Sequence, residues 1–194
     1  MNSETALLLG LALGFSLTIP PGPMNALIAT RSVRSLRRGV LTGLGAMSAD
    51  LVLGILVYGF RAEIPLGSIV RWVYLVGAGV MVYLGVRVIQ RQQEPPAIRE
   101  ETSDARTYTQ AVLVGVSNPF QIIWWLTAGL AVAYLGGLVL FVGLFGAIAV
   151  WVFSFSAAIY LGTRRRPNIA RAVVYASIAI MFALAAYFVA LAVG

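Results

Sequence analysis

Long apolar stretches alternate with short polar ones along this chain. Each apolar stretch contains about 20 residues or more, which is the length that an α-helix needs to cross roughly 30 Å of hydrocarbon. The polar stretches between them hold most of the charged residues. The pattern therefore predicts an all-α polytopic membrane protein with six transmembrane helices, over about 5–30, 39–60, 69–89, 108–133, 138–161 and 169–193.

The longest polar stretch predicts how the six spans are grouped. Residues 90–107 combine two consecutive prolines with charges of both signs, which is typical of a flexible, solvated linker. This cytoplasmic linker separates a first three-helix repeat, residues 1–89, from a second, residues 108–194. Because each repeat has an odd number of spans, the two must lie in opposite orientations in the membrane, as inverted repeats do in many secondary transporters.

The first apolar segment contains an unusual interruption, GFSLTIPPGPMN over residues 14–25. Proline lacks the N–H that a helix needs, which costs roughly 3 kcal/mol or more, and in lipid the freed carbonyls cannot turn to water. A shorter interruption, GVSNPFQ over 115–121, lies in the first segment of the second repeat. Breaks at corresponding positions of two repeats point to a transporter's binding site. Five spans with a re-entrant first segment are the alternative.

The residues at the second break suit a helix that restarts inside the membrane. Asn118 can cap the new helix, with Pro119 at its first position and Gln121 at its third. Such helix starts carry partial positive charge, so two of them can face an anionic group such as a carboxylate. Two purely structural kinks are the other interpretation, because proline and glycine are tolerated in membrane helices. The first break holds comparable residues at Pro21, Gly22, Pro23 and Asn25.

Asp50 is the acidic residue that lies in the interior of a predicted span. Counted inward at about 1.5 Å per residue, Asp50, Gly22 and Asn118 all lie about 12 to 17 Å deep, close to the bilayer midplane. A charged side chain at this depth costs at least ~2.5 kcal/mol, so it is expected to face the bundle interior. It can carry a proton or pair with a substrate ammonium group. The alternative is a protonated packing residue that is hydrogen-bonded to Ser48 or a neighbouring hydroxyl.

Composition narrows the possible functions. The chain is 60% hydrophobic and 11% charged, whereas soluble domains are about 25% charged. It contains no cysteine and no histidine, which removes disulfides, imidazole bases and most transition-metal ligands. With a single intramembrane acid, neither a Ser-His triad nor an aspartyl dyad can be assembled. We therefore expect no enzyme activity, no cofactor and no metal site.

The basic residues predict topology. All fourteen are arginine, and in the six-span arrangement twelve lie on one side, where the positive-inside rule places the cytoplasm. Both termini are then outside. The net charge of +7 is interpreted as a topology signal, so no nucleic-acid partner is expected.

Two further groups of residues have candidate roles. The tryptophans are expected to pack or to anchor the spans more often than to line a cavity, and the spaced glycines allow close helix approach within one chain or in a homodimer. The tryptophans meant here are Trp124, Trp125 and Trp151, three of the four in the chain. The glycine pairs are Gly10 with Gly14 and Gly39 with Gly43.

The sequence resembles the LysE/RhtB family of amino-acid exporters over essentially its whole length. The resemblance is carried by PPGPMNALI at 20–28, by Asp50 in the second span, by SNPFQ at 117–121, and by six spans in about 200 residues. It implies export of amino acids or their derivatives across the plasma membrane, driven by the proton gradient, in an inverted-repeat fold that can dimerise. The matching positions are Pro21, Gly22, Pro23, Asn25, Asp50, Asn118 and Pro119.

Together these observations predict a secondary transporter that works by alternating access. The carboxylate of a zwitterionic amino acid would face the two helix starts, and Asp50 would alternate between the substrate ammonium and a proton, which makes the transport an antiport. The expected partners are the amino acid and membrane lipids. A cation or metal-ion exporter and a non-transporting membrane scaffold subunit are the alternatives.

Overall fold

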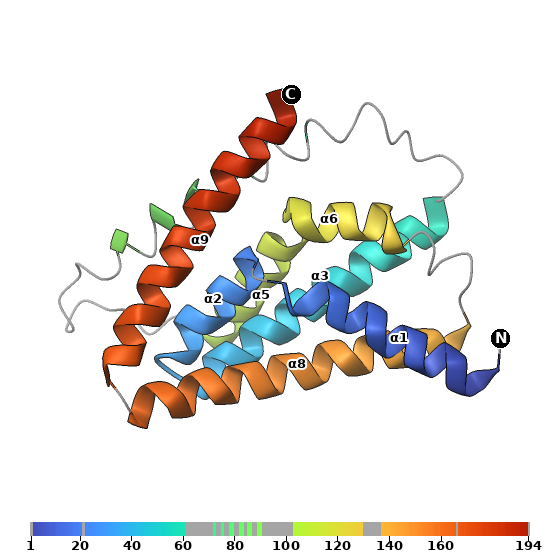
Figure 1. The fold of residues 1–194 in the computed structure, drawn as a ribbon, viewed down its shortest axis with the longest axis horizontal. Coiled ribbons are helices and arrows are strands. Elements are labelled where there is room, and N and C mark those ends of the chain that lie inside the picture. Colours follow the sequence, from blue (N-terminus) through green and yellow to red (C-terminus); the bar gives the residue numbers. More distant parts are fainter. Residues whose placement is uncertain are drawn as a thin grey trace.

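The computed structural model in Figure 1 is built from helices. It describes residues 2–20, 22–60, 103–129, 137–165 and 167–193, together with scattered residues between 72 and 90. These ranges contain helices and turns but no strand. Pro21, most of the predicted third span and most of the predicted linker lie outside the described residues.

The described helices follow the predicted apolar segments closely. The first, second, fifth and sixth segments differ from their helices by no more than four residues at either end. Their bounds are α1 Ser3–Thr18, α2 Pro23–Ser32, α3 Leu36–Phe60, α5 Asp104–Val116, α6 Pro119–Leu126, α8 Leu138–Arg165 and α9 Pro167–Val193.

The fourth segment differs from its prediction at both ends. Its helix α5 begins at Asp104, inside the stretch assigned to the linker, because the Ser103 hydroxyl accepts a hydrogen bond from the Arg106 amide at 3.3 Å. After the break, α6 ends at Leu126, short of the expected end at 133. The predicted boundary at 107 therefore falls within a helix.

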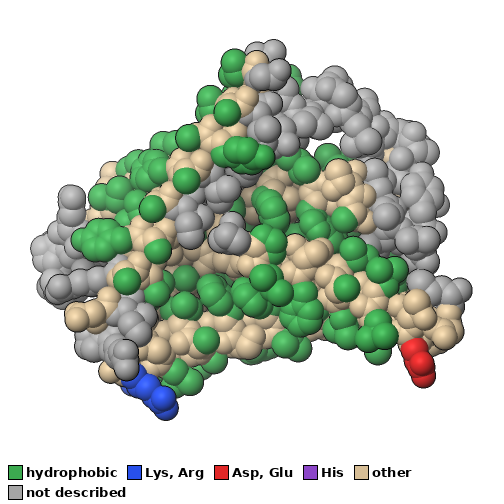
Figure 2. All heavy atoms as spheres, in the orientation of Figure 1, with side chains coloured by type: hydrophobic (Ala, Val, Ile, Leu, Met, Phe, Trp, Pro, Cys, Tyr) green, Lys and Arg blue, Asp and Glu red, His purple; other side chains and the backbone are tan. Residues whose placement is uncertain are grey.

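Two helices in the described part, α3 and α8, are each long and apolar enough to cross a membrane. The pair α1 and α2 passes the same test only together, with a bend of 77° between them, which gives a third candidate span if the pair counts as one. Bulky side chains on the outer faces of α3 and α8 are exposed, among them Ile55, Val142 and Phe153. Figure 2 shows hydrophobic side chains over much of one face of the molecule. The part of the chain that the structure describes is helical and contains two or three candidate membrane spans, while six spans in two inverted repeats stay a prediction.

Each long helix packs against the broken segment of the other predicted repeat. Helix α1 lies along α8, and α5 lies along α3, as Figure 1 shows. Helix α2 packs against both α3 and α9. The first broken segment is therefore held by α8 and α9 from the opposite half and by α3 from its own half, whereas α5 and α6 of the second broken segment pack against α3 from the opposite half.

The contact of α1 with α8 depends on glycine. A Cβ atom added to Gly143 would lie 3.1 Å from the Leu11 backbone nitrogen and 3.2 Å from the Gly10 Cα atom. At the contact of α3 with α8, Gly43 faces the side chain of Val152. The predicted close approach of helices at these glycines is confirmed, and it is made within one chain.

We expect Gly14→Ala to destabilise the protein. The new Cβ atom would lie 2.8 Å from the Ala147 Cβ atom and 3.1 Å from the Leu144 carbonyl carbon, so the two helices would have to move apart. Overpacking of this kind typically costs about 1–3 kcal/mol. The melting temperature of the purified protein in detergent should fall, whereas Gly146→Ala, where the added atom meets nothing within 4 Å, should leave it nearly unchanged. Equal melting temperatures of the two variants would contradict this account of the interface.

Candidate functional site

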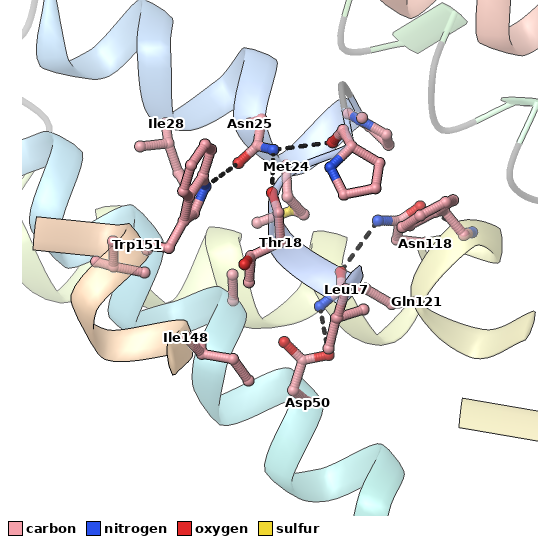
Figure 3. Close-up of a pocket in the computed structure, with 17 residues that line it drawn as sticks. Leu17, Thr18, Met24, Asn25, Ile28, Asp50, Asn118, Gln121, Ile148 and Trp151 are labelled. Atoms are coloured by element: carbon pink, nitrogen blue, oxygen red, sulfur yellow. Dashed lines mark hydrogen bonds between the residues drawn. The ribbon is translucent and has the colours of Figure 1, made fainter. Parts of the chain in front are cut away.

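Asp50 lies in the interior of the helix bundle, as predicted. It projects from the middle of α3 and is 3% exposed. Its Oδ1 atom accepts two hydrogen bonds from α6, one from Gln121 Nε2 at 2.9 Å and one from Trp125 Nε1 at 3.0 Å. Within the described part of the chain no donor reaches the other oxygen, Oδ2, which Figure 3 shows pointing away from Gln121.

The alternative that paired Asp50 with Ser48 is wrong. Residues two apart on a helix point to different sides. Ser48 instead donates to the Leu44 carbonyl at 3.0 Å, and its hydroxyl lies 2.6 Å from the hydroxyl of Tyr108 on α5. It therefore joins α3 to α5, away from the carboxylate.

The start of α6 confirms the predicted helix restart. Pro119 occupies its first position, and Asn118 Oδ1 accepts a hydrogen bond from the Phe120 amide at 3.1 Å. Asn118 also donates from Nδ2 to Gln121 Oε1 at 3.0 Å. Because the Gln121 oxygen is held in this way, its NH₂ group is directed toward Asp50. The helix cap and the carboxylate therefore belong to one buried hydrogen-bond chain.

The start of α2 also matches its prediction. Gly22 precedes the helix in an extended conformation, and Pro23 takes the first helical position. Unlike α6, this helix has no side-chain cap. Its first amides therefore have no side-chain acceptor, and Pro21 just before them lies outside the described residues.

The side chain of Asn25 stabilises the first break by hydrogen bonds to its backbone carbonyls. Its Nδ2 atom donates to the carbonyls of Thr18 at 2.5 Å and Pro20 at 3.0 Å, both of which the break leaves without helical partners. Its Oδ1 atom accepts a hydrogen bond from Trp151 Nε1 at 3.0 Å. Lipid offers these carbonyls no alternative donor, so the amide of Asn25 makes the break possible. Its predicted role in binding substrate stays a prediction.

One pocket brings together Asp50 and both helix starts (Figure 3). The cavity itself is small, with about 40 Å³ accessible to the centres of water molecules, and it lies within about 450 Å³ of space between the lining atoms that includes the part open to the surroundings. Gly22, Pro23 and Asn25 line it from α2, and Asn118 and Gln121 from α6. The structure therefore brings both breaks and the acid together, although Pro119 is buried outside the lining, and their depth in the membrane stays a prediction.

The three tryptophans Trp124, Trp125 and Trp151 have different environments. Trp151 lines the pocket, Trp125 donates to Asp50 from outside the lining, and Trp124 donates to the Ser16 hydroxyl at 3.2 Å. Gln121 was expected at the helix start, but neither its hydrogen bond to Asp50 nor that of Trp125 was predicted from the sequence. Their spacing was the available signal, because Gln121 and Trp125 are four residues apart and so share one face of a helix.

Arginine-rich segments meet at one end of the bundle. The end of α2, the start of α3 and the end of α8 lie together in Figure 1. At this end Arg37 forms an ion pair with Asp104, and Arg31 Nη2 donates to Gln110 Oε1 at 2.9 Å. The end of α8 carries Arg164 and Arg165.

The described residues contain no group of three or more His, Cys, Asp or Glu side chains placed to hold an ion.

This helical membrane bundle, with two breaks and one buried carboxylate, belongs to a known class of transport proteins. The family model described as "LysE type translocator" matches residues 15–192, so the chain belongs to this family. The expected resemblance is thereby confirmed, and the family is one of transporters, not of enzymes.

A curated relative supports the same class. It is described as "Putative amino acid efflux protein YcgF" from Bacillus subtilis (strain 168) and is 29% identical over 121 residues. The match covers 60% of this chain and 58% of the relative, which is less than two thirds of the relative's length. No solved structure matches the chain.

Proposed function

We propose that this protein exports amino acids or close derivatives from the cytoplasm. The observation that carries the proposal is the pocket in which one buried carboxylate, Asp50, lies beside two helix starts. These are the complementary groups for the ammonium and the carboxylate that all amino acids share. Membership of a translocator family and the similarity to an efflux protein support it.

The two helix starts differ in their capacity to bind a carboxylate. The first amide donor of α6 is already engaged by the Asn118 side chain at 3.1 Å. The start of α2 has no side-chain cap, so its amides at Met24 and Asn25 are available to an anion. We assign the substrate carboxylate to α2 and the ammonium to Oδ2 of Asp50.

Transport is coupled to protons if the carboxylate of Asp50 binds both the substrate ammonium group and a proton. A proton on Asp50 removes the charge that attracts an ammonium group, so substrate and proton bind in alternation. Export on one half of the cycle and proton return on the other constitute antiport. The proposal includes alternating access of two inverted three-helix repeats, with both termini outside the plasma membrane and the arginine-rich end in the cytoplasm. A homodimer is compatible with it.

Transport driven by a pH gradient tests this function. Proteoliposomes with an acidic lumen should accumulate a labelled amino acid above its external concentration, because protons leaving the vesicle drive substrate entry. Accumulation should collapse when a protonophore dissipates the gradient, and protein-free liposomes provide the background. Amino-acid flux that does not depend on the pH gradient would contradict antiport. No flux of any amino acid would contradict the transport proposal itself and favour the scaffold interpretation.

A further inference from the structure

All the residues that line the pocket lie in the described part of the chain. Asp50 is the one ionisable side chain among them. We infer that the substrate is an amino acid with an uncharged, apolar side chain. This inference rests on the proposed function and narrows its substrate class.

The pocket offers partners for one positive and one negative charge of a substrate. The backbone of any amino acid brings one ammonium and one carboxylate group, and Asp50 with the start of α2 match these two. A lysine, arginine or glutamate substrate would bring a third charge. That charge would have no partner in the lining, because the ion pair of Arg37 with Asp104 lies at the arginine-rich end, outside the pocket. Burial of an unpaired charge is strongly unfavourable.

The uncharged polar groups of the lining are already engaged. Thr18 donates its hydroxyl to the Gly14 carbonyl at 2.9 Å, and Asn25 uses both amide hydrogens on backbone carbonyls. The amides of Asn118 and Gln121 are bound to each other and to Asp50. A polar substrate side chain would therefore have few free groups to bind, chiefly the second amide hydrogens of Asn118 and Gln121.

Most of the remaining wall is apolar. It is formed by side chains from α1, α2 and α8 that are almost fully buried, with Ile28 at 3%, Ile148 at 2% and Val152 at 2% exposure. Trp151 adds a large flat surface, stacked on Phe155 with ring centroids 5.2 Å apart. Surfaces of this kind recognise shape and apolar area, so they favour aliphatic, thioether or aromatic side chains.

Competition in proteoliposomes tests the inference without any mutation. Proteoliposomes that contain the wild-type protein are loaded with labelled leucine. Unlabelled valine, methionine, phenylalanine, lysine, arginine or glutamate is then added outside, and its exchange for the labelled leucine is measured. The apolar amino acids are expected to compete at concentrations at least about tenfold lower than the charged ones. If lysine, arginine or glutamate is exchanged as well as or better than leucine, the substrate class is wrong while the export function stands. If no amino acid moves, both proposals fail.

A pair of variants tests whether the substrate side chain contacts this wall. Ile148→Ala enlarges the pocket, so it should change the ratio of leucine to phenylalanine transport by about tenfold, in favour of phenylalanine. Val150→Ala is the matched control, because Val150 is on the same helix but 58% exposed, and it should leave the ratio unchanged. An unchanged ratio in Ile148→Ala, with folded protein confirmed by its melting temperature, would overturn the assignment of the side chain to this wall.

Discussion

Asp50→Asn is expected to abolish accumulation of amino acids driven by a pH gradient while leaving the protein folded. The amide oxygen can still accept the hydrogen bonds from Gln121 Nε2 and Trp125 Nε1, now at 2.9 and 3.0 Å from the carboxylate. The side chain can no longer carry a proton or a negative charge. Loss of a charge-assisted hydrogen bond of about 1.5–3 kcal/mol corresponds to roughly 10- to 150-fold weaker substrate binding. Flux in proteoliposomes and the melting temperature measure the two effects.

Asp104→Asn is the matched control for removal of an acid. Asp104 pairs with Arg37 at the arginine-rich end, where their side chains are 37% and 77% exposed. Exposed ion pairs contribute about 0–1 kcal/mol, so this variant should fold and transport almost normally. Uphill accumulation by Asp50→Asn equal to that of wild type would remove Asp50 from the coupling mechanism.

Asn25→Ala should cause the largest loss of stability. It removes three hydrogen bonds and leaves the carbonyls of Thr18 and Pro20 and the indole N–H of Trp151 without their partner. These groups are part-buried, so each one left unsatisfied costs near the lower end of about 1–3 kcal/mol, for a total of about 3 kcal/mol. We expect a large fall in melting temperature and little monodisperse protein in size-exclusion chromatography.

Two further variants make the stability test specific. Asn168→Ala is the matched control. Asn168 lies near the start of α9, directly after Pro167, but is exposed, so this variant should behave like wild type. Asn25→Asp keeps an acceptor for Trp151 but loses both donors to the backbone, so it should resemble Asn25→Ala more than wild type. Normal stability of Asn25→Ala would show that the break is held by other contacts.

Local chemistry made the helix boundaries and both breaks predictable. Apolar segments mark α3 and α8 directly, and the restart of α6 could be inferred from three residues, because a capping asparagine, a proline and a glutamine suit those positions in any helix. The start of α5 was predicted too late, since Ser103 and Asp104 look like linker residues until the cap is seen. The six spans stay a prediction because most of the third lies outside the described residues.

The partners of Asp50 could not be predicted in the same way. Gln121 and Trp125 follow it by 71 and 75 positions, and only the packing of α6 against α3 brings them to the carboxylate. The alternative based on sequence proximity named Ser48, whose hydroxyl has other partners. The depth estimate placed Asp50 near both breaks, but depth alone does not specify which donor faces which oxygen.

The pairing of α1 with α8 and of α5 with α3 has a consequence for the synthesis of the protein. When the first broken segment enters the membrane, the helix that covers its glycines has not yet been made, and the partner of Asn25, Trp151, follows it by 126 positions. The first half must therefore wait, incompletely packed, until the second half is inserted. The order in which the helices are made is not the order in which they assemble, and the bundle can close only when nearly all of the chain has left the ribosome.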